Sequence, residues 1–324
     1  MKIDAHSHIE IPEAVASLPK KVDALAEISP KSKAIQEQLT KSLQDQLENP
    51  ERRVADMKQM RLDLSVISIA PPQFYYDLEG KVAIEFTRRQ NDRLAEIVRA
   101  YPGKFLGMAT VPLQNVQAAV AELERAVTSL KMKGVEIGSN IQGRYLGDPV
   151  FLPFFEKVAH FDIPIFIHPR DVAGMNRLTD FYFGNLIGNP LDTTITASHI
   201  IFSGLLDRFP RLKIILSHAG GQLPYTCGRL RHGFKVRPEC KGIIKRSPID
   251  YVKMFYYDTI AHDADSLRFL ISRVGADHVV IGTDYPYDMG DLDPVGSVEA
   301  LTELPADQKA KIMGENAKSL FKIS

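Results

Sequence analysis

Short runs of apolar residues, rich in Val, Ile and Phe, recur along the chain and are separated by amphipathic stretches. Runs that stay apolar for several residues are typical of parallel strands buried on both faces. Eight such runs predict strands at residues 2–9, 64–71, 105–112, 134–140, 164–170, 213–220, 254–261 and 278–286. Helical patterns fill most of the intervals, among them residues 83–100, 116–130, 152–161 and 264–274. This alternation predicts an α/β fold, a single (β/α)8 TIM barrel.

An open, doubly wound sheet is the competing layout for alternating strands and helices. It would need a Gly-rich phosphate-binding turn after an early strand, and neither G-x-G-x-x-G nor G-x-x-x-x-G-K-[ST] follows a predicted strand here. The chain also has no internal repeat and no Pro/Gly/Ser-rich linker. We therefore expect residues 1–324 to form one barrel domain.

Two intervals are longer than one helix and its turns require. Residues 10–63 follow the first strand and hold a charged, Gln-rich helical segment at 32–48 and a second helix at 52–60. Residues 171–211 follow the fifth strand and hold aromatic residues and Gly at 181–185, then a helix from about 192 to 209. Both insertions would leave the C-terminal rim of the barrel, where loops form lids and pocket walls.

Composition limits the classes of partner. The chain has 324 residues, of which 44% are hydrophobic, and its 40 basic and 40 acidic residues cancel. Without a net charge there is no global field to attract nucleic acid or an anionic membrane. There is no signal-peptide pattern and no apolar run near the ~20 residues that span a bilayer. Cys227 and Cys240 are too few for a disulfide framework, so we expect a cytoplasmic protein.

Histidine and aspartate mark the ends of four predicted strands. His6 and His8 lie two residues apart on the first strand, so their side chains point to the same side. His168 ends the fifth strand, His218 the sixth, and Asp284 the eighth. The C-terminal ends of barrel strands surround one pocket. Taken alone, each His could be a buried core residue, and Asp284 could cap a helix. Together they predict a site for a divalent cation with an open coordination position.

The motifs at these strand ends resemble those of the amidohydrolase superfamily, and the resemblance covers nearly the whole chain. The segments that carry it are Ile3-Asp4-Ala5-His6-Ser7-His8, His168-Pro169-Arg170-Asp171, Ser217-His218-Ala219-Gly220-Gly221 and Gly282-Thr283-Asp284-Tyr285-Pro286. They are similar to the branch that contains 2-amino-3-carboxymuconate-6-semialdehyde decarboxylase. The fourth strand ends in Gly138-Ser139-Asn140 and offers no lysine that could be carbamylated to bridge two metals. The resemblance therefore implies one metal, with Zn²⁺ expected and Mn²⁺ as the alternative.

The resemblance also implies a role for each site residue. The metal ligands match His6, His8, His168 and Asp284, and Asp284 counts with His218 as catalytic. His218 would act as acid/base beside a metal-bound water. Two arginines that bind the substrate carboxylate match Arg53 and Arg229. Arg229 would reach into the pocket of the partner subunit, so a homodimer is expected.

One departure leaves the substrate open. The decarboxylase branch has Trp after the His-Pro of the fifth strand, whereas this chain has Arg170 and no Trp. Resorcylate-type benzoate decarboxylases resemble the chain in that Arg but begin with Glu-x-His. Because Arg170 follows His168 directly, it would point away from the metal on a strand and could form an ion pair at the rim.

The resulting hypothesis is a metal-dependent non-oxidative decarboxylase, a carboxy-lyase, acting on a small unsaturated or aromatic carboxylic acid. Decarboxylation requires delivery of a proton, and histidine is suited to it because its charge changes near neutral pH. The alternative is a metal-dependent hydrolase or hydratase of a lactone or ring-cleavage acid that uses the same site. A barrel that binds a ligand without turnover is the non-enzymatic alternative. His262 and Asp263, after the seventh strand, are further candidates to line the pocket.

Overall fold

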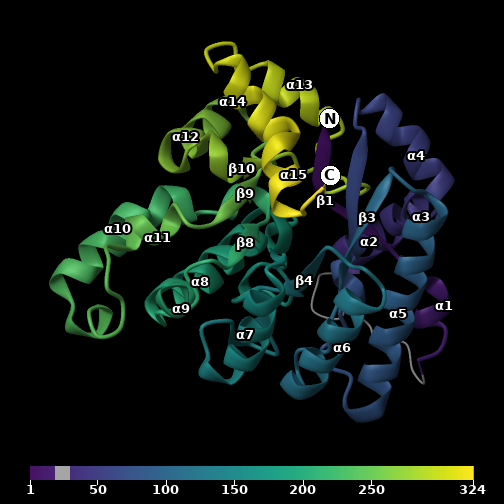
Figure 1. Cartoon of the computed structure of the whole chain (residues 1–324), viewed down its shortest axis with the longest axis horizontal. Helices are drawn as coiled ribbons and strands as arrows, with labels where there is room; N and C mark the ends of the chain where they lie inside the picture. The colour runs from purple at the N-terminus through teal and green to yellow at the C-terminus, as the bar shows by residue number, and fades with distance from the viewer. Residues whose placement is uncertain (19–29, 324) are drawn as a thin grey trace.

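The computed structural model describes residues 1–18 and 30–323. Within these residues, eight parallel strands form one sheet in the order β1-β2-β3-β4-β7-β8-β9-β10, surrounded by helices (Figure 1). The strands are β1 (Ile3–Ile9), β2 (Leu64–Ile69), β3 (Phe105–Ala109), β4 (Gly134–Gly138), β7 (Pro164–His168), β8 (Lys213–Leu216), β9 (Tyr256–Asp258) and β10 (Val279–Val280). A short antiparallel pair, β5 (Asn140–Ile141) and β6 (Arg144–Tyr145), follows β4.

The sheet closes into a barrel through backbone groups of β1 and the segment after β10. Ala5 N donates to Ile281 O at 2.8 Å, and His8 N donates to Tyr285 O at 2.9 Å. Ser7 and Tyr285 form a parallel bridge. The predicted (β/α)8 TIM barrel, with insertions after the first and fifth barrel strands, is therefore confirmed.

The strands end earlier than the apolar runs suggested. The sixth strand was expected to reach residue 220, but β8 ends at Leu216 and His218 N instead donates to the Asp258 carboxylate at 2.9 Å. The eighth was expected to reach residue 286, but β10 ends at Val280 and the backbone turns at Asp284, with φ 52°. At both strand ends the backbone leaves the ladder so that a polar side chain can turn into the barrel mouth.

Helices fill the intervals between strands as predicted. They are α5 (Gly80–Ala100), α6 (Val116–Thr128), α7 (Leu152–Phe161) and α12 (Ala264–Val274). The Asn115 side chain caps α6 by accepting from Ala118 N, and Asp263 caps α12 by accepting from Ser266 N at 2.8 Å. Such caps satisfy backbone donors that have no partner inside the helix.

The insertion after β1 contains α1 (Pro12–Val15), α2 (Pro30–Ser42), α3 (Gln44–Glu48) and α4 (Pro50–Gln59). The helix predicted at 32–48 is therefore divided at Leu43. Asn49 begins α4, because its side chain accepts from Glu51 N and Arg52 N while Pro50 occupies the first helical position. Residues 19–29 of this insertion lie outside the described residues.

The insertion after β7 runs through a π-helical turn, η4 (Gly184–Gly188), into α8 (Asn189–Phe202) and α9 (Leu205–Arg208). The helix predicted from about 192 to 209 is interrupted at Gly204, whose φ of 73° is readily available to glycine. Phe181 and Tyr182 also have positive φ.

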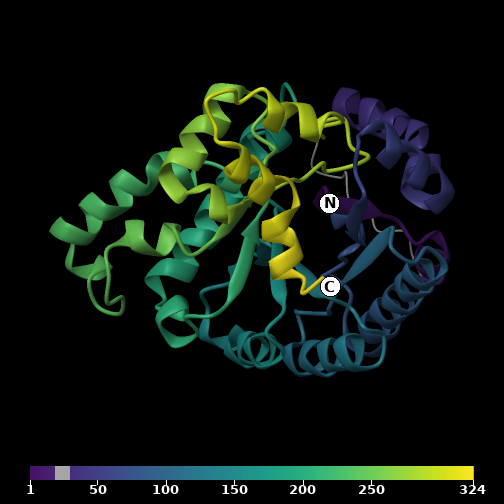
Figure 2. The same cartoon turned by 45° about the horizontal axis from the view of Figure 1, so that its top comes forward.

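Helices α10 (Leu223–Val236) and α11 (Pro248–Val252) extend away from the barrel, as both views show (Figures 1 and 2). The C-terminal segment forms α13 (Pro294–Glu299), α14 (Ala306–Ala310) and α15 (Asn316–Leu320). None of these helices, nor any other among the described residues, is long and apolar enough to cross a membrane.

The N-terminal end of the barrel is sealed by an apolar cluster. Leu320 and Phe321, at the end of α15, pack with Ile3, Leu64 and Phe166 of the strands. Burial of these side chains stabilises the fold at that end. The C-terminal ends of the strands are left to carry polar side chains.

Candidate metal centre

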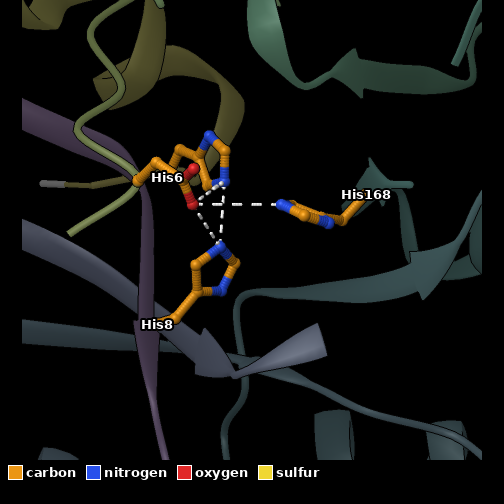
Figure 3. A group of neighbouring side chains, drawn as sticks. His6, His8 and His168 are labelled. Atoms are coloured by element: carbon orange, nitrogen blue, oxygen red, sulfur yellow. Dashed lines mark hydrogen bonds and ion pairs between the residues drawn. The ribbon is translucent and has the colours of Figure 1, made fainter. Parts of the chain in front are cut away.

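Three histidines and one aspartate converge at the C-terminal end of the barrel (Figure 3). His6 and His8 come from β1, His168 from the end of β7, and Asp284 from the turn after β10. One ligand atom from each residue lies within 4.8 Å of all the others, and all four residues are buried. Residues 278 positions apart in the sequence are thus brought to one point.

The distances are those of a set of donors around one cation. Asp284 Oδ1 lies 3.0 Å from His8 Nε2, 3.3 Å from His6 Nε2 and 3.9 Å from His168 Nε2. His168 Nε2 and Asp284 Oδ1 are buried without a hydrogen-bond partner among the described residues. Buried polar atoms are normally hydrogen-bonded. Three imidazole nitrogens and one carboxylate oxygen fit one divalent cation, with a position free for a further ligand.

Three of the four residues also make polar contacts on the side away from the shared centre. His6 Nδ1 lies 2.7 Å from Asp258 Oδ2, and His168 Nδ1 lies 2.9 Å from Pro169 O. Asp284 Oδ2 lies 3.4 Å from His218 Nε2. Such outer contacts fix the tautomer and orientation of a ligand before the metal binds.

The charges of the metal-free site follow from burial and from the carboxylates. Burial lowers the pKa of His8 to about 3 and that of His168 to about 4. Burial also acts to lower the pKa of His6, but Asp284 and Asp258 outweigh it and raise that pKa to about 10. His8 and His168 therefore offer free lone pairs at neutral pH, whereas His6 must lose a proton to bind a cation.

Asp258, at the end of β9, was not singled out in the sequence. It is fully buried and accepts hydrogen bonds from His6 Nδ1 and from the backbone N–H groups of His218 (2.9 Å) and Ala219 (2.7 Å). Burial acts to raise the pKa of Asp258, but these donors and the charge on His6 hold it below its ordinary value. Asp258 could have been identified as a site residue from its position at the end of a strand, where the other polar residues of the site also lie.

His218 stands beside the metal centre. Four consecutive residues from His218 to Gly221 have positive φ, which turns the imidazole toward Asp284. A Cβ on Gly220 would lie 2.4 Å from the Tyr257 ring, and one on Gly221 would lie 2.2 Å from Pro190 O. The two glycines of the motif are therefore required by these close contacts and by their positive φ. Nδ1 of His218 has no hydrogen-bond partner among the described residues.

His218 lines a cavity of about 720 Å³. Its walls are mainly apolar and aromatic: Leu186, Pro224, Tyr225, Ile260, Phe269 and Met289. His262 also lines this cavity, whereas Asp263 caps α12. A mostly apolar pocket with a few polar groups is typical of a small-molecule site.

Arg53 is not one of the described residues that line this cavity, and its side chain contacts β1 instead. Its side chain is fully buried, donates to His8 O, and lies 3.3 Å from Ser7 Oγ. The guanidinium carbon is 4.6 Å from the centre of the Tyr285 ring. These donors hold the end of β1 in place, and burial lowers the pKa of Arg53 to about 10.

Arg229 and Arg170 lie outside the centre. Arg229 is exposed on α10, one turn beyond the Pro224 and Tyr225 that line the cavity, and it is not itself one of the described lining residues. Arg170 Nε pairs with Asp171 at 3.2 Å, an ion pair at the rim.

Tyr287, three residues after Asp284, was also missed in the sequence. Its ring centre lies 5.7 Å from that of His8, and its hydroxyl is buried without a partner among the described residues. Burial raises the pKa of Tyr287 well above its ordinary value, so the phenol stays neutral and able to donate a hydrogen bond.

The fold and the site define a metal-dependent barrel enzyme, and comparisons with known proteins agree. A family model described as amidohydrolase matches residues 3–323. The 2-amino-3-carboxymuconate-6-semialdehyde decarboxylase of Dictyostelium discoideum is 32% identical over 98% of this chain and 90% of its own length.

Two solved structures have the same fold. The 5-carboxyvanillate decarboxylase of Sphingomonas paucimobilis superposes with a TM-score of 0.86 at 27% identity, covering 100% of this chain and 99% of that one. A dihydroxybenzoic acid decarboxylase from Polaromonas sp. JS666, crystallised with manganese and the inhibitor 2-nitroresorcinol, gives a TM-score of 0.84 at 28% identity, covering 99% and 97%.

The chain belongs to the amidohydrolase family. The predicted relationship to the 2-amino-3-carboxymuconate-6-semialdehyde decarboxylase branch and the predicted class of enzyme, a metal-dependent carboxy-lyase, are both confirmed. The hydrolase or hydratase alternative is not favoured.

Proposed function

We propose that this carboxy-lyase removes CO2 from a small aromatic or unsaturated carboxylic acid, with His218 as its proton donor. The observation that carries this proposal is the position of His218. Its Nε2 lies 3.4 Å from Asp284 Oδ2 of the metal centre, and the residue lines the cavity. The Polaromonas relative was crystallised with an aromatic inhibitor, 2-nitroresorcinol, which supports a ligand of this size.

The reaction sets two tasks for the residues of the site. The bond between the carboxylate carbon and the neighbouring carbon breaks, and its electron pair stays on the carbon that loses CO2. A proton must then reach that carbon, and His218, which lines the cavity and lies 3.4 Å from Asp284, is the residue proposed to carry it. The apolar and aromatic walls suit the hydrophobic part of such a substrate.

We propose His6, His8, His168 and Asp284 as the ligands of one divalent cation. When bound, such a cation supplies Lewis-acid polarisation of a substrate oxygen. Asp284 is assigned a catalytic role as well, because its Oδ1 faces the histidines and its Oδ2 lies 3.4 Å from His218. Zn²⁺ is suited to a set of imidazoles and a carboxylate, whereas manganese is the metal in the Polaromonas relative.

Arg53 and Arg229 are proposed to bind the substrate carboxylate, since guanidinium groups form charge-assisted, bidentate contacts with carboxylates. For Arg53 the support is a buried Nε without a partner among the described residues. For Arg229 the support is an exposed position on α10, a helix that extends away from its own barrel. We therefore propose a homodimer in which Arg229 completes the pocket of its partner. Two free cysteines are the basis for proposing a cytoplasmic location.

The experiment that tests this function measures CO2. Metal-loaded protein is incubated with dihydroxybenzoates, carboxymuconates and related acids, and released CO2 is quantified beside the acid consumed. Equimolar CO2 release supports the proposal. Consumption of a lactone or ring-cleavage acid by addition of water, without CO2, would identify a hydrolase or hydratase instead.

A further inference from the structure

His8 differs from the other histidines of the metal centre in its outer contacts. His6 Nδ1 is held by Asp258 at 2.7 Å, and His168 Nδ1 by Pro169 O at 2.9 Å. The corresponding atom of His8, Nδ1, is buried and has no hydrogen-bond partner among the described residues. A metal-ligating histidine that offers Nε2 to the cation carries its proton on Nδ1, and that N–H nearly always has an acceptor.

The carboxylate closest to this nitrogen belongs to Glu136, in the middle of β4. Its Oε1 lies 3.9 Å from His8 Nδ1, and its side chain is 1% exposed. Both carboxylate oxygens lack a hydrogen-bond partner among the described residues. The Ser68 hydroxyl donates to Ser7 O at 3.1 Å, and it also lies close enough to Glu136 to act on that carboxyl group. Two unpartnered buried groups of complementary chemistry, a donor and an acceptor, thus face each other.

Packing alone does not account for an acid at this position. Glu136 has no arginine or lysine within ion-pairing distance among the described residues. A methionine has a similar size and would fill the same space without burying an unsatisfied polar group. By contrast, the buried Glu122 of α6 is fully engaged, with Arg125 and Asn91 as partners.

We infer that Glu136 is a positioning residue for the metal centre, one that accepts the Nδ1–H of His8 and so holds the His8 ring with Nε2 toward the cation. A rotation of the Glu136 side chain that closes about 1 Å brings the two atoms to hydrogen-bond distance. Glu136 then accepts a hydrogen bond from His8 Nδ1 and orients its ring, as Asp258 does for His6. This inference rests on the proposed role of His8 as a metal ligand.

The test compares Glu136→Met, which removes the acceptor, with Glu136→Gln, which keeps an acceptor oxygen but loses the charge. Glu122→Gln is the matched control, a buried glutamate outside the barrel interior. Metal affinity is measured by competition of Mn²⁺ or Zn²⁺ with a chromophoric chelator. Thermal unfolding of the metal-free proteins is measured in parallel, and the visible spectrum of the Co²⁺ forms reports the coordination number.

We expect Glu136→Met to weaken metal binding by about 10- to 100-fold, the range found for such outer contacts. Glu136→Gln should lose less, about threefold or more, because its amide oxygen still accepts the hydrogen bond. The metal-free Glu136→Met protein should be at least as heat-stable as the wild type, since it no longer buries an unpartnered acid. A residue needed only for folding would lower heat stability instead.

Three results would overturn the inference. One is wild-type metal affinity in folded Glu136→Met, or in Glu136→Gln should the Met variant not fold. Another is equal loss of affinity in Glu122→Gln. The third is a Co²⁺ spectrum showing one ligand fewer in Glu136→Met, because Glu136 would then bind the metal directly. A wild-type protein that binds no metal would contradict the proposed function itself, so the two failures are distinguishable.

Discussion

His6 Nε2 and His8 Nε2 lie 3.0 Å apart in the interior of the barrel, with the ring planes at 84°. Both side chains are fully buried, and Asp284 Oδ1 lies within 3.3 Å of each nitrogen. Two imidazole lone pairs at this distance repel unless a proton or a cation lies between them. The two histidines of β1 therefore share one positive charge, a proton in the metal-free protein or a bound cation. The predictions on metal binding follow from this exchange.

Metal loading is expected to release a proton. The carboxylates of Asp284 and Asp258, outweighing burial, raise the pKa of His6 to about 10 in the metal-free protein, so His6 is protonated below that pH. The metal-free form therefore holds more protons than the loaded form, and metal affinity must rise with pH up to about 10. We expect release of about one proton, and a tenfold gain in apparent affinity per pH unit, between roughly pH 6 and 9.

Calorimetric titration in two buffers with different enthalpies of ionisation measures this proton. If metal affinity does not change with pH across that window and no proton is released, His6 does not carry a proton in the metal-free protein.

His218→Ala should separate chemistry from metal binding. The imidazole lies 3.4 Å from Asp284 and lines the cavity, but it is not one of the four proposed ligands, so its removal leaves them in place. We expect full metal content and a fall in kcat of at least about 100-fold. Metal analysis and steady-state CO2 release measure the two quantities. Undiminished turnover would remove His218 from the reaction.

Arg229→Ala should weaken substrate binding and leave the metal in place. Since Arg229 is exposed on a helix that leaves its own barrel, we expect KM to rise by 10-fold or more, about the loss of a charge-assisted hydrogen bond. Arg231→Ala, two residues further along α10 and also exposed, is the control and should keep wild-type KM.

Mixed dimers test whether Arg229 acts across the interface. A subunit carrying Arg229→Ala has an intact His218 and receives Arg229 from a partner carrying His218→Ala. Random mixing of equal amounts should therefore restore about one site in four. If Arg229 served its own subunit, mixing would restore no activity.

Arg53→Met should destabilise the fold. Its guanidinium donates to His8 O and lies against the Tyr285 ring, and its loss would leave a buried carbonyl without that partner. We expect a loss of about 2–4 kcal/mol in the free energy of unfolding. The neighbouring Arg52→Met is the control, because Arg52 is 47% exposed and pairs with Asp56 at the surface, so its free energy of unfolding should stay close to that of the wild type.

Urea unfolding of the metal-free proteins measures this difference. An Arg53→Met protein as stable as the wild type would contradict the role of Arg53 in holding β1, and an unchanged KM would contradict its proposed contact with the substrate.

Much of the architecture could be predicted from the sequence because buried parallel strands leave a continuous apolar signature. Strand ends were also informative, since a polar residue directly after such a run, as at His168 and Asp284, has few other places to point. The bounds were less predictable. Residues 217–220 and 281–286 directly follow apolar strand residues, yet His218 N is bonded to the Asp258 side chain and Asp284 has a positive φ, so neither segment continues its strand.

The outer contacts of the site could not be predicted, because they depend on distances between strands rather than on spacing along the chain. Asp258 and Glu136 lie 252 and 128 residues from the histidines that they face. Glu136 has Val135 and Ile137 beside it and gives no sign of its direction in a buried strand. Arg53 was assigned to the substrate by resemblance, whereas its contacts with β1 became visible only in the folded chain.

Removal and return of the metal is the most direct test of the proposed function. CO2 release from the acids that serve as substrates should fall to background when the protein is stripped with a chelator. It should return in proportion to added Mn²⁺ or Zn²⁺ and level off near one ion per chain, as the single cluster of described ligands implies. Full CO2 release by protein shown to contain no metal would contradict a reaction centred on His6, His8, His168 and Asp284.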